Sequence, residues 1–159
     1  MKNESLCADD LEIIEKYSDM VYRMAYSMVK NRFDAEDIHQ EVFMKYLKKS
    51  PVFENSEHEK AWFLRVTVNH CKNFWKSAWI QKVIGLAEGD ASAQKEDIHD
   101  ELIDTVKMLP QKYRAVIHLF YYEDLSIEEI SEVLGEKTST VRTQLTRARN
   151  KLKKLLEEE

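Results

Sequence analysis

Apolar residues recur at helical spacing through the first half of the chain. Between Asp10 and Val29 they fall three or four positions apart, at Leu11, Ile14, Tyr17, Val21, Met24 and Met28. A second helix is predicted from Asp34, which can cap its start, and the connection before it is Asn31-Arg32-Phe33. Ser50-Pro51 ends this helix, because the residue before a proline disfavours helical backbone. A third helix is predicted from about Glu57 to about Trp79.

The helical pattern weakens in the middle of the chain and then returns. The segment 80–104 contains Gly85, Gly89 and a polar run, so we expect a flexible tether there. Helices are predicted over Gln111–Tyr122, Leu125–Leu134 and Thr138–Leu156. With only three Gly and two Pro and no strand-like alternation, the chain is predicted to be all-α. The predicted organisation is two small helical domains, 9–79 and 105–156, joined by a linker at 80–104.

The sequence around Gly135 predicts a helix-turn-helix. Gly135 can adopt the positive φ that ends the first helix, and Thr138 can cap the second. One side of the second helix is apolar, and the other carries short hydroxyl residues flanked by arginines. In such motifs the start of the second helix meets base edges of duplex DNA. The residues predicted to contact duplex DNA are Ser139, Thr140, Arg142, Thr143, Thr146 and Arg147.

Charge is segregated along this acidic chain, whose formal net charge is -5. The segment Lys137–Leu156 contains seven Lys or Arg and no acid, and Lys60–Lys82 contains five and no acid. Two basic blocks favour nucleic-acid contact more than the net charge argues against it. The competing interpretation of each block is a solvated helix face whose charges only keep it soluble.

The basic segment Lys60–Lys82 also holds all three tryptophans. On a helical projection Trp75 falls on the core face, whereas Trp62 lies on a polar face among cations and amides. Such a face suits unpaired nucleic acid, because bases stack on aromatic rings and cations neutralise phosphates. The residues predicted to contact unpaired DNA are Trp62, Arg65, Asn69, Lys72, Asn73 and Lys76. Spacing alone fits equally well a Trp62 that caps the core under the segment preceding the helix.

The second predicted helix has an acidic outward face. Asp37, Gln40, Glu41 and Met44 share it, and from the residues alone an ordinary surface is a simpler interpretation than a protein-binding patch.

No feature of the sequence indicates catalysis. There is no nucleophile–base pair, Gly-rich phosphate loop or metal-ligand spacing, so no catalytic residue, metal, cofactor or small-molecule substrate is expected. Cys7 and Cys71 lack metal-ligand or redox spacing, and no apolar run is long enough to span a bilayer. We therefore expect a cytoplasmic protein without direct membrane insertion.

Three blocks of the sequence resemble the extracytoplasmic-function (ECF) sigma factors of bacterial RNA polymerase. DAEDIHQEVFMKYL (34–47) and AWFLRVTVNHCKNF (61–74) resemble region two of that family. LPQKYRAVIHLFYYEDLSIEEISEVLGEKTSTVRTQLTRARNKL (109–152) resembles the whole of region four. The resemblance covers roughly Tyr17 to Leu155. Family members often have Asp where Asn73 stands and Ala where Ser131 stands.

The resemblance implies a role for each surface. It implies that Asp37, Gln40, Glu41 and Met44 face the coiled coil of the β′ subunit, in place of the ordinary surface inferred from the residues alone. It implies that the helix 62–76 and its neighbouring loops bind the melted minus-ten element. It also implies that the helix Ser139–Arg149, including Arg149, reads the minus-thirty-five element, that the core polymerase contacts extend to the β flap, and that an anti-sigma factor controls the protein.

Two other classes of protein compete with this interpretation. A stand-alone helix-turn-helix regulator, binding an operator as a homodimer, would explain the C-terminal half of the chain. It would not explain Trp62 among cations or the DAED block. A small enzyme is disfavoured by the absence of catalytic motifs, although the fold could assemble a site from distant residues.

Overall fold

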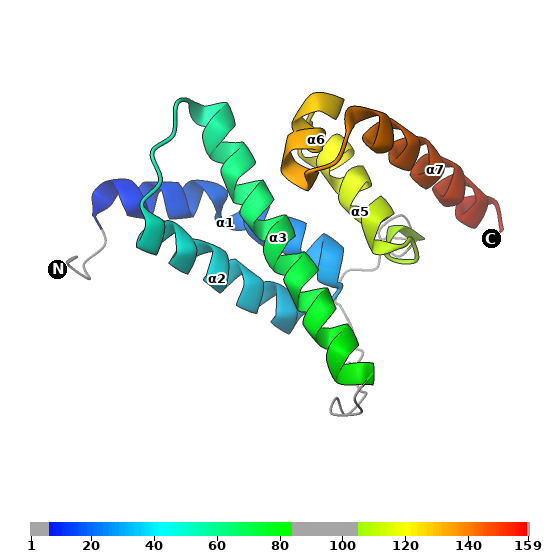
Figure 1. Ribbon diagram of the computed structural model, residues 1–159, viewed down its shortest axis with the longest axis horizontal. Coiled ribbons are helices and arrows are strands. Elements are labelled where there is room, and N and C mark those ends of the chain that lie inside the picture. The colour runs from blue at the N-terminus through cyan, green and yellow to red at the C-terminus, as the bar shows by residue number, and fades with distance from the viewer. Residues whose placement is uncertain (1–6, 84–104, 159) are drawn as a thin grey trace.

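The computed structural model of the chain describes residues 7–83 and 105–158, which are helical apart from short connections (Figure 1). The first half contains α1 (Ala8–Val29), α2 (Arg32–Lys49) and α3 (Ser56–Val83). The second half contains α5 (Gln111–Ile117), the π-helical turn η1 (His118–Tyr122), α6 (Ile127–Leu134) and α7 (Thr138–Glu157). The all-α prediction is confirmed. Most of the predicted tether, residues 84–104, lies outside the described residues.

An aromatic core holds α1, α2 and α3 together. Phe63 on α3 is completely buried and stacks on Tyr17 of α1, with ring centroids 4.7 Å apart. Phe43 and Tyr46 of α2 pack against the same ring at 5.5 and 5.4 Å. The apolar stripe predicted for α1 is buried from Tyr17 onward, whereas Leu11 near the helix start is 52% exposed. The long α3 therefore has one face in this core, and it also packs against α6 of the second half.

The boundaries of two helices differ from those predicted. Asn31 caps α2, because its side-chain oxygen accepts from the backbone N–H groups of Phe33 and Asp34. The predicted cap at Asp34 was therefore wrong, and Arg32 and Phe33 belong to the helix and not to a connection. At the other end α2 stops before Ser50-Pro51, as predicted. α3 continues past Trp79 to Val83.

The second half has its own buried centre. Leu109, Val116, Leu119, Ile130 and Val141 are almost completely inaccessible, and they come from every element between α5 and α7 or from the residues just before α5. The predicted helix Gln111–Tyr122 is present as α5 followed by the π-helical turn η1. α5, α6 and α7 form a second group of helices beside the first bundle (Figure 1).

Candidate nucleic-acid interface

The helix-turn-helix is built by strong local signals at α6. Ser126 and Glu129 form a reciprocal capping box at its start, each side chain accepting from the other residue's backbone N–H. Gly135 ends the helix with φ +69°, in the left-handed region that favours glycine. The Ser131 hydroxyl donates to the carbonyl of Glu136 and so ties the turn back to the helix. These residues fix the angle at which α7 leaves α6.

α7 begins without a side-chain cap. Its N-cap residue is Lys137, which makes no capping hydrogen bond, and Thr138 is the first helical residue. The prediction that Thr138 caps this helix was therefore wrong. The N–H groups of the first turn are left without a side-chain acceptor, and they carry the partial positive charge of a helix start.

The two faces of α7 separate as the spacing predicted. Val141, Leu145 and Ala148 are buried against the rest of the second half. The predicted duplex-contact residues lie on the opposite side, where all are exposed except Thr140, which is half-buried. The Thr143 hydroxyl donates to the carbonyl of Ser139 at 3.0 Å, so its oxygen remains free to accept. α7 therefore presents hydroxyl groups and arginines on one open face.

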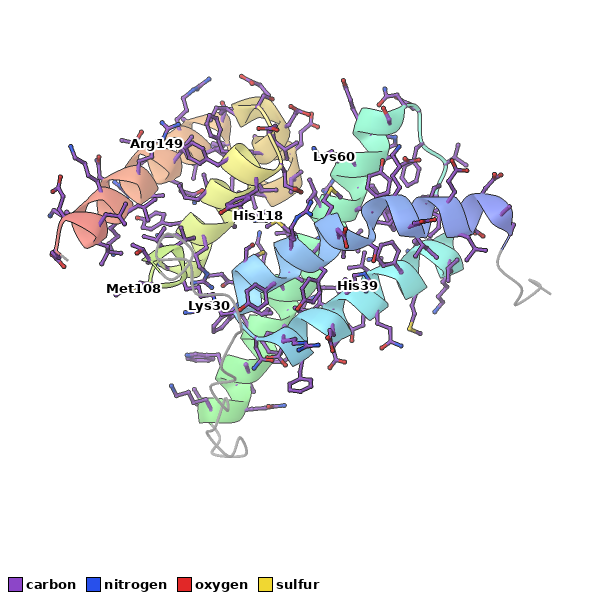
Figure 2. All side chains as sticks on the ribbon, turned by 180° about the vertical axis from the view of Figure 1, so that it is seen from behind. Lys30, His39, Lys60, Met108, His118 and Arg149 are labelled. Atoms are coloured by element: carbon purple, nitrogen blue, oxygen red, sulfur yellow. The ribbon has the colours of Figure 1, made fainter. Side chains whose placement is uncertain are left out.

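Arg149 has a different environment from the other predicted contacts. Its Nε donates to the hydroxyl of Tyr121 at 2.6 Å, and its guanidinium lies 5.1 Å from the ring centroid of Phe120. The guanidinium is 5.5 Å from the Tyr121 ring as well. Arg149 thus packs along the aromatic edge of η1, with its position labelled in Figure 2.

α3 presents the second basic face. Arg65, Asn69, Lys72, Asn73 and Lys76 are all exposed, and their spacing places them on one side of the helix. Between Lys60 and Lys82 there is no acid to neutralise this face from within the helix. The structure therefore brings five of the six predicted single-strand contacts together on one surface.

Trp62 differs from those five residues because it is half-buried. Its ring packs edge-on against Phe63 at 5.0 Å, Phe53 at 5.8 Å and Tyr46 at 6.2 Å. Phe53 belongs to the segment that precedes α3. This packing matches the alternative in which Trp62 caps the core under the segment that precedes the helix.

The acidic face of α2 is open. Asp37, Gln40, Glu41 and Met44 are all exposed, and Met44 shows 61% of its surface. The Nδ1 of His70 on α3 lies 3.2 Å from a carboxylate oxygen of Glu41, while burial lowers the pKa of His70. α2 thus offers a methionine among acidic and amide groups on a face that the bundle does not cover.

The two halves pack together through α1 and α3 on one side and α5, η1 and α6 on the other. Lys60 donates from Nζ to the carbonyl of Glu123 at 2.7 Å. Lys72, a predicted DNA contact, donates to the carbonyl of Leu134 at the end of α6, at 3.2 Å. Figure 2 labels Lys60 and His118 on the two sides of this boundary. In this conformation the Lys72 ammonium caps a helix of the other half.

Arg114 is a residue whose role sequence reasoning missed. It is only 3% exposed, and its guanidinium donates to the carbonyls of Ser27 and Met28 at the end of α1. A third bond goes to Leu109 just before α5. Burial lowers the pKa of Arg114, whereas the carbonyl end of α1 favours a cation there. The only signal in the sequence was a charged residue inside the apolar run YRAVIHLF.

Among the described residues, every helix is too short or too polar to span a bilayer. Within the same residues, no group of three or more His, Cys, Asp or Glu side chains is arranged to hold a metal ion.

Comparison with protein families assigns both halves of the chain. Residues 13–80 match the model of Sigma-70 region 2, and residues 99–152 match the model of Sigma-70, region 4. The RNA polymerase sigma factor SigV of Bacillus subtilis is 38% identical over 133 residues, covering 80% of this chain and 78% of that protein. The ECF RNA polymerase sigma factor SigW of the same organism is 30% identical, covering 91% of this chain and 87% of that protein.

Two solved structures share the fold. The sigma factor RpoE of Bartonella quintana, solved in complex with the anti-sigma factor NepR, aligns with a TM-score of 0.76 at 24% identity. That alignment covers 95% of this chain and 98% of RpoE. CnrH, solved with the cytosolic domain of CnrY, aligns with a TM-score of 0.68 at 20% identity, covering 94% of this chain and 88% of CnrH.

These matches define the class of protein as a sigma factor with regions two and four. The chain belongs to the ECF sigma factors of RNA polymerase, which direct promoter-specific initiation of transcription. Sigma factors are not enzymes, so the prediction that this chain is not an enzyme is confirmed through its family. The competing interpretations, a dimeric operator-binding regulator and a small enzyme, are set aside.

Proposed function

We propose that this sigma factor recognises its promoter with two separate surfaces. The exposed face of α7 reads the minus-thirty-five element as duplex in the major groove, and the exposed face of α3 holds the melted minus-ten strand. The observation that carries this assignment is that α3 and α7 each contain a long stretch without acids, 60–82 and 137–156, whose cations are exposed in different halves of the chain. The hydroxyls of α7 permit close approach to base edges, whereas the amides and cations of α3 suit an unstacked strand.

The proposed mechanism is capture of strands that the duplex transiently releases. Binding of an unstacked base offsets the few kcal/mol that unpairing costs, so binding energy drives melting. The segment joining the two halves raises the effective concentration of one surface once the other is bound. In this scheme the domains extend over 9–79 and 105–156, with the linker at 80–104 between them. The core polymerase supplies all of the bond chemistry.

The proposed partner surfaces are those that the resemblance to ECF sigma factors implies. The face of α2 that carries Asp37, Gln40, Glu41 and Met44 is proposed to bind the β′ coiled coil, and the second half is proposed to meet the β flap. An exposed methionine beside acids is an adaptable protein-binding surface. RpoE and CnrH were solved with NepR and with the cytosolic domain of CnrY, and an anti-sigma factor is proposed for this chain too. Its place of action is then the cytoplasm, with the polymerase.

Run-off transcription tests the proposal. Purified bacterial core polymerase would be incubated with sheared genomic DNA, with and without this protein, and transcript starts would be mapped. We expect discrete new starts that share two upstream elements. The double variant Arg65→Ala/Asn69→Ala should lose these transcripts while its holoenzyme still binds a duplex carrying only the minus-thirty-five element.

The matched variant for the other surface is Thr143→Ala/Arg147→Ala. It should lose binding to that duplex, and its transcripts should fall because the upstream element no longer recruits the holoenzyme. New starts that share no upstream element would contradict promoter reading by α7. Loss of minus-thirty-five duplex binding in the α3 variant would contradict the division of labour between the two helices.

A further inference from the structure

A groove of about 300 Å³ lies between the start of α5 and the exposed face of α7. Lys112 and Tyr113 of α5 line one side, and Ser139, Thr143 and Arg147 of α7 line the other. The α7 residues belong to the set proposed to meet duplex DNA. Neither residue from α5 was predicted to take part, because Gln111–Tyr122 is a mainly apolar segment in the sequence. The structure thus places a cation from another helix beside the DNA-reading face.

The charge of this groove is wholly positive. No acidic residue lines it, and neither Lys112 nor Arg147 forms an ion pair within the described residues 7–83 and 105–158. The ring of Tyr113, a residue that is only 8% exposed, lies close to the ammonium groups of Lys112 and Lys151. The Nζ of Lys112 lies 5.2 Å from its centroid, and that of Lys151 lies 6.0 Å from it. A buried aromatic therefore positions two ammonium groups along the edge of α7.

The polar groups of the groove complement a phosphodiester. Lys112 of α5 and Arg147 of α7 supply charged donors, and Ser139, which carries a hydroxyl, also lines the groove. The first turn of α7 adds backbone N–H groups without a side-chain cap. Protein–DNA hydrogen bonds to phosphates fix the register and angle of a reading helix without carrying sequence information. A cation on α5 suits that purpose, because it holds the strand beside α7 from a second, rigid element.

We infer that this groove seats one phosphodiester of the duplex flanking the reading helix, and that Lys112 is the phosphate-positioning residue. The inference rests on the proposed duplex reading by α7. The alternative is that Lys112 is a solvated lysine that lies against Tyr113 and contacts nothing further.

The salt dependence of DNA binding distinguishes a phosphate-positioning Lys112 from a solvated one. Holoenzyme formed from core polymerase and the full chain would be titrated at several salt concentrations. The probes are short duplexes carrying the mapped minus-thirty-five element or a scrambled version of it. Each neutralised phosphate contributes ~0.9 to the slope of log affinity against log salt. Lys112→Gln should therefore flatten the slope by ~0.9 and weaken both duplexes by the same factor. Lys112→Arg should keep the slope, since it keeps the charge.

Lys49→Gln is the matched control, because Lys49 is an exposed lysine at the end of α2 and remote from the groove. Its slope should equal that of the unmodified protein. An unchanged slope for Lys112→Gln would show a solvated lysine and overturn the inference. A changed ratio between the two duplexes would also overturn it, because Lys112 would then read a base. If the unmodified holoenzyme does not distinguish the duplexes, the proposed duplex reading itself fails.

Discussion

At the scale of single residues, the boundary between the two halves is marked by buried ionisable groups. His118 is 6% exposed and Glu123 is 4% exposed, and both belong to or adjoin η1. Burial, with Arg23 nearby, lowers the pKa of His118 from 6.5 to about 4. Burial raises the pKa of Glu123, although Arg23 and Lys60 oppose that change. As the pH falls, the lowered pKa of His118 therefore reduces the free energy of unfolding, whereas the raised pKa of Glu123 increases it.

His118 should make the stability of the protein fall on mild acidification. The unfolded chain takes up a proton near pH 6.5, whereas the folded protein takes it up only near pH 4. The free energy of unfolding should therefore decrease by about 3 kcal/mol in total as the pH drops between these values. His118→Phe keeps a ring beside Tyr122, on which His118 stacks at 5.3 Å, and it removes the proton site.

Urea denaturation of both proteins between pH 7 and pH 4 measures this effect. The difference between the two curves isolates His118, because the contribution of Glu123 is common to both. Parallel curves would mean that the folded protein protonates His118 at an ordinary pH, in conflict with its burial.

At the scale of secondary structure, the two helices of the helix-turn-helix begin in different ways. α6 starts with a complete capping box, and α7 starts at an uncapped Lys137. Capping stabilises α6 internally, whereas the free N–H groups of α7 remain available to an anion at the surface proposed to meet DNA.

This difference predicts unequal costs for two similar substitutions. Ser126→Ala removes the side chain that accepts from Glu129, and it should lower the free energy of unfolding by ~1 kcal/mol. Thr138→Ala should change it by much less, because Thr138 provides no cap. Urea denaturation at neutral pH compares the two variants. A loss for Thr138→Ala as large as that for Ser126→Ala would show that α7 is capped by Thr138 after all.

At the scale of the whole molecule, the halves are joined by side chains that reach across to helix ends. Arg114 caps α1, Lys72 caps α6, and Lys60 donates to the carbonyl of Glu123 after η1. In this conformation the Leu134 carbonyl accepts from one of the three donors of the exposed Lys72 ammonium. The proposed contact of Lys72 with the minus-ten strand would use the remaining donors or release the carbonyl.

Removing the cations around Glu123 should open the molecule. An oxygen of the Glu123 carboxylate lies 3.7 Å from Arg23, and a second, buried oxygen has no hydrogen-bond partner. The double variant Arg23→Gln/Lys60→Gln removes this ion pair and the hydrogen bond from Lys60 to the Glu123 carbonyl, both of which join the two halves. We expect a larger radius of gyration in small-angle X-ray scattering of the free protein.

The control for this experiment is Lys16→Gln/Arg32→Gln, which removes two cations whose ion-pair partners, Glu59 and Glu36, lie in the first half. Its radius of gyration should match that of the unmodified protein. Equal radii for all three proteins would mean that the contacts of Arg23 and Lys60 with Glu123 do not hold the halves together.

The sequence by itself determined the features that depend on local chemistry. Helical spacing, the glycine at 135 and the proline at 51 placed most helices, and the acid-free runs located both basic faces. It also led to two wrong predictions of a helix start, with caps at Asp34 and Thr138. The helices begin slightly earlier, after the N-cap residues Asn31 and Lys137. Only the tertiary structure decided what Trp62, Lys72, Arg114 and Lys112 contact. Their neighbours, Tyr46, Leu134, Met28 and the α7 face, come mostly from other helices, and one-dimensional periodicity carries no information about such non-local partners.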